Sequence, residues 1–162
     1  MKGHALNHQD ATQFITAGNA TVTFLNTKSG NRFTFKIKKC KQDRQTVLKD
    51  DIFFVSILTS PDTYQYIGTM KDGSYKHGKT SKISTTAQSV QVFNYVLKKL
   101  QSNSLPTFIE IWHEGKCGRC GRDLTVPESI ENGLGPECIK MVVSPDVLKQ
   151  MKRDRVIKSI IG

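Results

Sequence analysis

Apolar and polar residues alternate along much of the first two thirds of the chain, a pattern typical of β-strands. In segment 32–39, Phe33, Phe35 and Ile37 alternate with cationic and hydroxyl side chains. The period of two predicts that the apolar side chains lie on one face of a sheet and the cations on the other. Segment 20–25 precedes this strand across a turn-rich stretch, so the two strands are predicted to form a β-hairpin.

A second hairpin is predicted where segments 63–70 and 74–77 flank Asp72-Gly73. This dipeptide readily adopts the positive φ angles of tight turns. The two strands should therefore be neighbours in an antiparallel sheet.

Two other patterns extend the sheet and add a helix. Segment 52–58 is a continuous apolar run, which predicts a buried central strand with Phe53 and Phe54 in the core. From Thr85 to Leu100 the apolar residues recur at steps of three and four, which predicts an amphipathic helix lying across the sheet. Segment 107–112 returns as a strand and leads to the cysteines.

Three of the four cysteines lie within 22 residues, at spacings that suit a metal site better than disulfides. Cys117 and Cys120 are two residues apart and each is followed by glycine, the spacing of a zinc knuckle. Pro136 predicts the start of a helix with Cys138 in its first turn, where free amides and the helix dipole favour the thiolate that zinc binds. One structural zinc ion is therefore the predicted cofactor.

The fourth zinc ligand is predicted to be His113, which precedes the knuckle at the end of a strand. Structural zinc sites have four ligands as a rule, so a partner for the three cysteines is needed. Cys40, His77 and Glu137 remain alternatives. Cys40 is the main rival, although its neighbours offer no ligand spacing and a free thiol is its simpler interpretation.

These elements predict an α+β fold made of an antiparallel β-sheet with one packed helix, a small zinc-knuckle or treble-clef-like lobe, and a C-terminal helix. The expected boundaries are a loose N-terminal segment over 1–10, an α+β domain over 11–112, the zinc lobe over 113–143 and a basic C-terminal helix over 144–162.

The cysteine region also resembles a known domain. The residues that carry the likeness are Trp112 to Thr125, Pro127 to Ile130 and Gly133 to Cys138, spanning 27 positions. They are similar to a zinc-knuckle domain of unknown function that is frequent in bacteriophage and bacterial proteins. This resemblance implies a structural metal and a phage or mobile-element origin. Some small phage proteins of this sort are zinc-containing anti-CRISPR proteins, so it also implies an inhibitor of a Cas9-type effector.

Charge points to a negatively charged partner. The formal net charge is +10, which disfavours a basic partner and favours nucleic acid or an acidic protein surface. Cations gather between Lys28 and Arg44, around the second hairpin beside Tyr64, Tyr66, Tyr75 and His77, and in the tail, where they could track phosphates while the rings stack on bases. Solvated strand and helix faces are the simpler explanation. The candidate contact residues are Arg32, Lys36, Lys38, Lys76, Lys79 and Arg153.

Catalysis is not expected. A thiol oxidoreductase needs its first cysteine at the start of a helix, and a zinc deaminase needs His-x-Glu well upstream of the cysteine pair. No small-molecule substrate is predicted. With no apolar run of about 18 residues, a membrane span is not expected, and we predict a cytoplasmic protein of a bacterial host cell. Two hypotheses follow: an anti-CRISPR-like inhibitor that blocks DNA binding by a Cas9-type effector, or a direct DNA- or RNA-binding zinc protein.

Overall fold

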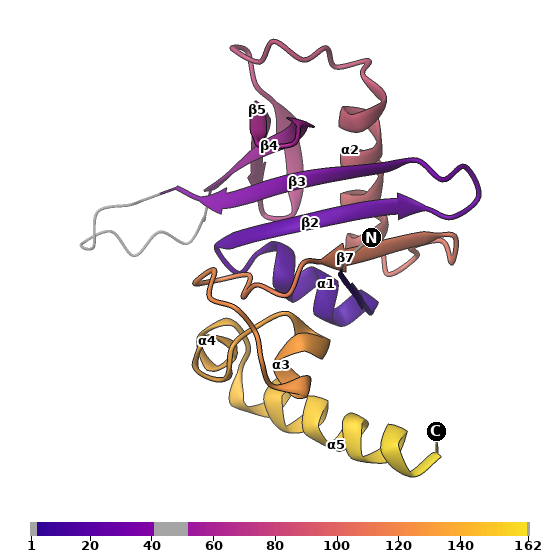
Figure 1. Cartoon of the computed structure of the whole chain (residues 1–162), viewed down its shortest axis with the longest axis vertical. Helices are drawn as coiled ribbons and strands as arrows, with labels where there is room; N and C mark the ends of the chain where they lie inside the picture. The colour runs from indigo at the N-terminus through magenta and orange to yellow at the C-terminus, as the bar shows by residue number, and fades with distance from the viewer. Residues whose placement is uncertain (1–2, 41–51, 162) are drawn as a thin grey trace.

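The computed structural model describes residues 3–40 and 52–161 (Figure 1). Its described residues form a seven-stranded antiparallel sheet in the order β1-β7-β2-β3-β4-β5-β6. The strands are β1 (His4–Leu6), β2 (Asn19–Asn26), β3 (Arg32–Lys39), β4 (Ile52–Ser60), β5 (Thr63–Lys71), β6 (Ser74–His77) and β7 (Ile109–His113). The helices are α1 (His8–Ile15), α2 (Gln88–Gln101), α3 (Pro127–Asn132), α4 (Pro136–Val142) and α5 (Pro145–Ile161). The predicted α+β class is confirmed.

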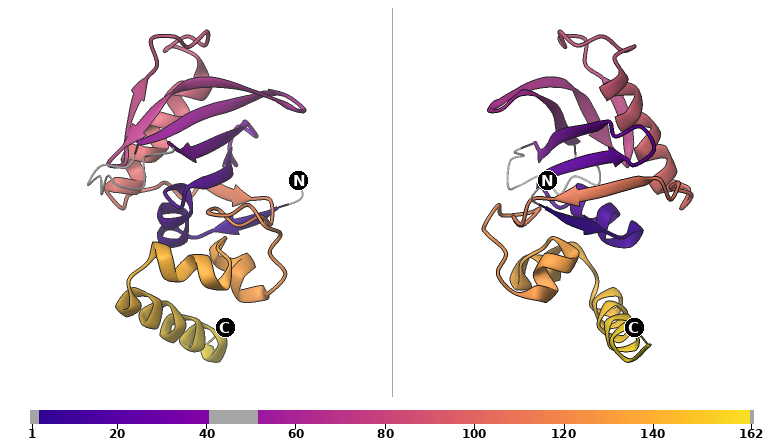
Figure 2. Two further views of the ribbon diagram at one scale, coloured as in Figure 1. Left: turned by 90° about the vertical axis from the view of Figure 1, so that its left-hand side faces the viewer. Right: turned by 45° about the vertical axis from the view of Figure 1, so that its right-hand side comes forward.

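Helices α1 and α2 lie on the same side of the sheet, and α3, α4 and α5 form a separate group beyond its β1–β7 end (Figures 1 and 2). The core fills the space between the sheet and α1 and α2. Its centre is aromatic: the ring centroid of Phe35 lies 5.3 Å from that of Phe24 and 4.8 Å from that of Phe93 on α2. The alternation in β3 therefore places its apolar side chains as the sequence predicted.

The first hairpin pairs β2 with β3, and the second pairs β5 with β6, both as predicted. Helix α2 begins at Gln88 rather than at Thr85, and Ala87, its N-cap residue, makes no side-chain capping bond. Its buried stripe still contains Val90, Phe93 and Leu97, because the apolar period is maintained across the later start.

Strand β4 differs from its prediction as a strand buried on both faces. Phe53, Val55 and Ile57 are buried beneath the helices, whereas Phe54 is 45% exposed on the opposite side. In the described part of the chain no helix packs against that side (Figure 2). A continuous apolar run therefore supplied one buried face and one exposed aromatic ring, and the expectation that Phe54 is in the core was wrong.

The side of the sheet opposite α1 and α2 is called the open face below. Strand alternation and burial assign to it outward residues of β3, β4, β5 and β6. The cations and aromatic residues that β3 to β6 place on it are Arg32, Lys36, Lys38, Phe54, Tyr64, Tyr66, Lys71 and Lys76, and Trp112 of β7 lies on the same side.

Residues 3–10 form a strand and the start of a helix, in contrast to the loose segment predicted for residues 1–10. Strand β1 pairs with β7, with His4 opposite His113. The side chain of Asn7 caps α1 by accepting a 2.8 Å hydrogen bond from the backbone N–H of Asp10, and α1 buries Phe14 completely. A three-residue strand and a two-turn helix carry too little periodicity to be recognised from the sequence.

Helix α5 matches the predicted C-terminal helix, and among its described side chains the buried apolar residue lies in its first half. Met151 is buried against the lobe, whereas Val156, Ile157 and Ile160 are more than half exposed. None of the described helices is both long and apolar enough to cross a bilayer.

Candidate metal centre

Cys117 and Cys120 lie in a tight turn that directly follows β7. The backbone N–H of Cys117 donates to the carbonyl of Arg122 at 2.8 Å, and that of Gly121 donates to the carbonyl of Cys117 at 2.9 Å. Gly121 has φ of 77°, a left-handed conformation that suits glycine. This small hairpin, closed by a bridge between Lys116 and Asp123, is the predicted knuckle.

Cys138 completes a cluster of three thiols. It lies in the first turn of α4 after Pro136, as predicted. The Sγ atoms of Cys117, Cys120 and Cys138 all lie within 4.8 Å of one another. Tetrahedral coordination with metal–sulfur bonds of about 2.3 Å needs sulfur separations of roughly 3.8 Å, so small side-chain adjustments bring these atoms onto one ion. The cluster can therefore hold a metal ion.

Backbone amides prepare Cys117 to be a thiolate. Burial opposes its ionisation, but hydrogen bonds from the backbone of Cys120, Gly135 and Arg119 outweigh burial and lower the pKa of the Cys117 thiol to about 7. The N–H of Gly135 lies 3.3 Å from the sulfur and that of Arg119 lies 3.5 Å from it. The guanidinium of Arg119 is also 3.6 Å from the Sγ of Cys138. Burial nevertheless raises the pKa of the Cys138 thiol, and the neighbouring thiols of Cys120 and Cys117 raise it further, so negative charge is favoured at Cys117.

His113 does not join this cluster, in contrast to its prediction as the fourth ligand. It is buried, its Nε2 lies 2.7 Å from the carbonyl oxygen of Ile130, and its Nδ1 accepts a 3.1 Å hydrogen bond from the N–H of Gly115. A neutral imidazole has one donor and one acceptor nitrogen, so this arrangement leaves no lone pair for a metal. Burial lowers the pKa of His113, and nearby His4 lowers it further, although the hydrogen bond to Ile130 acts in the opposite direction. The lowered pKa keeps the ring neutral.

The alternatives to His113 are also outside the cluster. Cys40 follows β3, and its N–H bonds to the carbonyl of Ile52. Both ring nitrogens of His77 have partners at 2.9 Å, the hydroxyl of Tyr75 and the carbonyl of Ile83. Across residues 3–40 and 52–161, no fourth Cys, His, Asp or Glu joins the three cysteines.

A cavity of about 350 Å³ borders the three cysteines. Asp123, Thr125 and Glu137 are among the residues that line it. If the cysteines held a metal, this cavity would have room for a fourth ligand, either water or a carboxylate that changes its rotamer.

The lobe is joined to the rest of the molecule through Phe14 of α1. A Cβ atom added to Gly118 would lie 2.6 Å from the Phe14 ring, and one added to Gly133 would lie 2.5 Å from it. Gly133 also ends α3 with φ of 78°. Both glycines therefore make room for one aromatic ring, a contact that sequence reasoning missed because Phe14 is about 100 residues away and carries no local signal.

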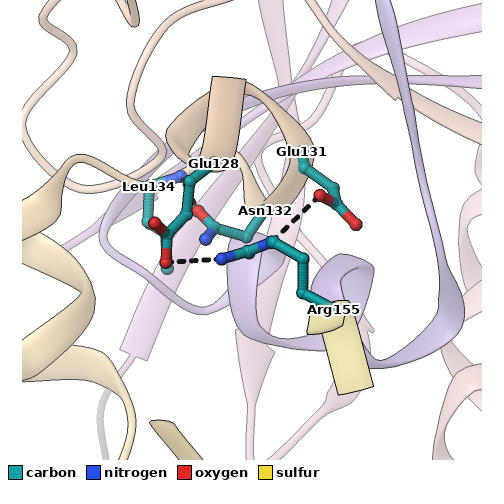
Figure 3. A network of polar contacts seen from close by, with 5 residues as sticks. All are labelled: Glu128, Glu131, Asn132, Leu134 and Arg155. Atoms are coloured by element: carbon teal, nitrogen blue, oxygen red, sulfur yellow. Dashed lines mark hydrogen bonds and ion pairs between the residues drawn. The ribbon is translucent and has the colours of Figure 1, made fainter. Parts of the chain in front are cut away.

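Arg155 fixes α5 to the lobe (Figure 3). Its guanidinium forms ion pairs with Glu128 and Glu131 of α3, with the Glu131 contact at 3.2 Å. Beside them, the side-chain oxygen of Asn132 accepts a 2.9 Å hydrogen bond from the N–H of Leu134. The charges of this part of the lobe thus largely satisfy one another.

The predicted contact cations fall into two groups. Arg32, Lys36, Lys38 and Lys76 share the open face, as the alternation predicted. Lys79 lies in the exposed turn after β6, and Arg153 is exposed on α5, in the separate helical group. The cations at 41 and 44 lie outside the described residues. Tyr75 and His77, predicted beside this surface, instead bond to one another and face the core.

Comparison with known proteins identifies the lobe alone. Residues 112–142 match a family of unknown function, DUF6011. These residues include the end of β7, the knuckle, α3 and α4. No curated protein and no solved structure matches the chain. The likeness therefore covers the candidate metal centre and carries no activity or partner with it.

Proposed function

We propose that this chain is a non-enzymatic zinc protein whose lobe is structural and whose sheet binds nucleic acid. Thiolate sets favour zinc, copper(I) or iron–sulfur clusters, and a knuckle followed by a helix-borne third cysteine is typical of structural zinc. A site with four protein ligands would leave no open position for catalysis, but His113 is engaged elsewhere and does not supply the fourth ligand. Support for binding comes from the sheet instead.

The observation that carries this proposal is the charge of the open face. Arg32, Lys36 and Lys38 of β3 share it with Lys71 at the end of β5 and Lys76 of β6. Among the described strands, the acidic side chain on this side is Glu110 of β7, which β2 separates from β3. A surface with cations on several neighbouring strands attracts phosphates and makes binding depend on salt.

Charge removal at two places in the chain tests the proposal. Lys38→Gln with Lys76→Gln removes two cations of the open face, and Lys98→Gln with Lys99→Gln removes two from α2 as the matched control. Binding to a labelled DNA oligonucleotide is measured by fluorescence anisotropy across a salt series. We expect the first pair to weaken binding and to reduce the log–log salt slope by about 0.7 to 0.9 per lost phosphate contact, and the control to bind as the unchanged protein does. Equal losses in both pairs, or no binding at low salt, would refute it.

The hypothesis of an inhibitor of a Cas9-type effector stays a prediction that rests on the sequence resemblance. The matched family has no known function, so it adds nothing to this hypothesis. The same assay distinguishes direct nucleic-acid binding from inhibition of a Cas9-type effector. An inhibitor of this kind forms a stoichiometric complex with the effector and lowers its DNA affinity without binding DNA tightly itself.

A further inference from the structure

The open face carries aromatic rings among its cations, and their arrangement indicates which form of nucleic acid it suits. Phe54 lies near the middle of the sheet and is 45% exposed. The ring of Tyr66 meets it edge to face at a centroid distance of 6.2 Å. Nearby, the ammonium group of Lys36 lies 4.7 Å from the centroid of the Tyr64 ring. The open face therefore combines positive charge with aromatic surface in one place.

The strand register aligns these groups into a row. Lys38 pairs with Phe54, Phe54 pairs with Thr69, and Thr69 pairs with Lys76. Neighbouring strands are about 4.8 Å apart, so the row runs for roughly 14 Å from one lysine to the other, with the phenyl ring between them. A base stacked on Phe54 would have a cation available on each side for its flanking phosphates.

We propose that the open face binds single-stranded nucleic acid along β3 to β6, with Phe54 as the main stacking surface and Lys38 and Lys76 holding the flanking phosphates. This inference rests on the proposed function, because it specifies the form of nucleic acid for the same surface. A duplex hides its base faces within the stack, whereas a single strand presents them to aromatic side chains. Phosphates and base faces are common to DNA and RNA, so the contacts invoked do not read the sugar.

Acidic groups limit the path of the strand. Glu110 lies on the same side of the sheet at β7. Burial and, after it, the nearby carboxylate of Glu114 raise the pKa of Tyr64, which places negative charge close to that tyrosine. Phosphates are therefore repelled from Glu110 on β7 and from the region of Glu114 near Tyr64, and the row from Lys38 to Lys76 is the favourable route.

The helix α2 offers a matched control for the aromatic contact. Tyr95 is 42% exposed there, and the ammonium group of Lys99 lies 5.5 Å from its ring centroid. This pair has the same chemistry as the aromatic and cationic groups of the open face but lies on the other side of the molecule. An exposed ring beside a lysine is thus present both inside and outside the proposed surface.

The test compares Phe54→Ala, Phe54→Trp and Tyr95→Ala for binding to a labelled 15-residue oligothymidylate and to a duplex of equal length. Stacking losses of one to three kcal/mol per base correspond to roughly 5- to 150-fold. We expect Phe54→Ala to weaken oligothymidylate binding by a factor in that range, Phe54→Trp to restore it, and Tyr95→Ala to leave it unchanged. Circular dichroism and thermal unfolding check that each variant is folded, and Phe54→Leu replaces Phe54→Ala if the latter is not.

The outcomes separate this inference from the proposed function. Salt-dependent binding that needs Lys38 and Lys76 but is equal for single strand and duplex, and is unchanged in Phe54→Ala, overturns the inference and leaves the proposed function standing. No binding of either oligonucleotide at low salt overturns both. Preference for the single strand that is lost in Phe54→Ala and restored in Phe54→Trp supports the inference.

Discussion

The sheet and the metal lobe are stabilised in different ways. Among the described residues, the core of the sheet contains 20 buried apolar residues, including five phenylalanines. The cluster at the lobe has seven, of which Ala17 comes from the turn after α1 and Met151 from α5, and two are the candidate ligands Cys117 and Cys138. A small apolar cluster alone gives little stability. The sheet therefore has a large apolar core of its own, whereas the stability of the lobe would depend more on a metal held by its cysteines.

The two regions also differ in charge. Residues 19–113 contain 14 cationic and 6 acidic residues, whereas residues 114–162 contain 9 and 7. In the lobe, acidic side chains pair with cations, as Arg155 shows with Glu128 and Glu131. The excess positive charge therefore belongs to the segment that contains the sheet and α2. If both proposals hold, stabilisation by a metal and attraction for a polyanion belong to different parts of one chain.

The largest loss of metal and of stability in the lobe is expected from Cys117→Ser. This change removes the buried ligand whose sulfur accepts two backbone N–H bonds, and metal binding supplies about 10 to 16 kcal/mol in small zinc modules. We expect stoichiometric metal to be lost by elemental analysis, and amide hydrogen exchange to show an unfolded lobe beside a protected sheet.

Cys40→Ser is the matched control, because Cys40 lies at the end of β3 outside the cluster. It should retain one metal ion per chain. A full metal content in Cys117→Ser, or the joint unfolding of sheet and lobe, would contradict the distinction between the two regions.

An intermediate effect is expected from His113→Phe. Phenylalanine keeps the ring that packs 5.4 Å from Phe14, centroid to centroid, but leaves the carbonyl of Ile130 and the N–H of Gly115 without their partners. Loss of such buried hydrogen bonds costs about 1 to 3 kcal/mol. Chemical denaturation should show this loss while elemental analysis shows unchanged metal.

The metal content of His113→Phe also tests whether His113 is a metal ligand, as the sequence predicted, or is not, as the structure indicates. If the metal is lost from His113→Phe while Cys40→Ser retains it, His113 is a ligand after all. The sequence prediction would then be correct, and the imidazole would have to turn away from Ile130 when metal binds.

The smallest effect is expected from Arg155→Gln. The two ion pairs of Arg155 are partly exposed, and pairs of this kind contribute about 1 kcal/mol or less. We expect faster proteolysis within α5, with metal content and the unfolding temperature of the sheet unchanged. Lys140→Gln is the control, since its pair with Glu137 is well exposed on α4. Similar proteolysis of both variants would show that Arg155 does not anchor α5.

Strand alternation and cysteine spacing were sufficient to predict much of this molecule. The period of two in β3 correctly separated Phe35 and Ile37 from Lys36 and Lys38, because a strand has two faces and only one is covered. The spacing of Cys117, Cys120 and Cys138 likewise anticipated a cluster that can hold a metal. Strand alternation is a local pattern, and the cysteine spacing follows from the geometry that a single metal ion imposes on its ligands.

Other features depended on contacts that no local pattern records. Phe54 has apolar neighbours on both sides in the sequence, so its exposure is decided by the absence of a packed helix on that side of the described fold. His113 has a ligand-like position in the sequence, but the carbonyl of Ile130, on a helix 17 residues later, bonds to its ring. Tertiary partners determine both outcomes.

The position of β7 limits how far the family-matched segment can be treated as a transferable module. The match begins at Trp112, within a strand that has β1 on one side and β2 on the other. A fragment cut at that residue would lose both neighbouring strands and the Phe14 ring on which Gly118 and Gly133 pack. Grafting this segment onto another protein therefore requires the host to supply a sheet edge and a replacement for that ring.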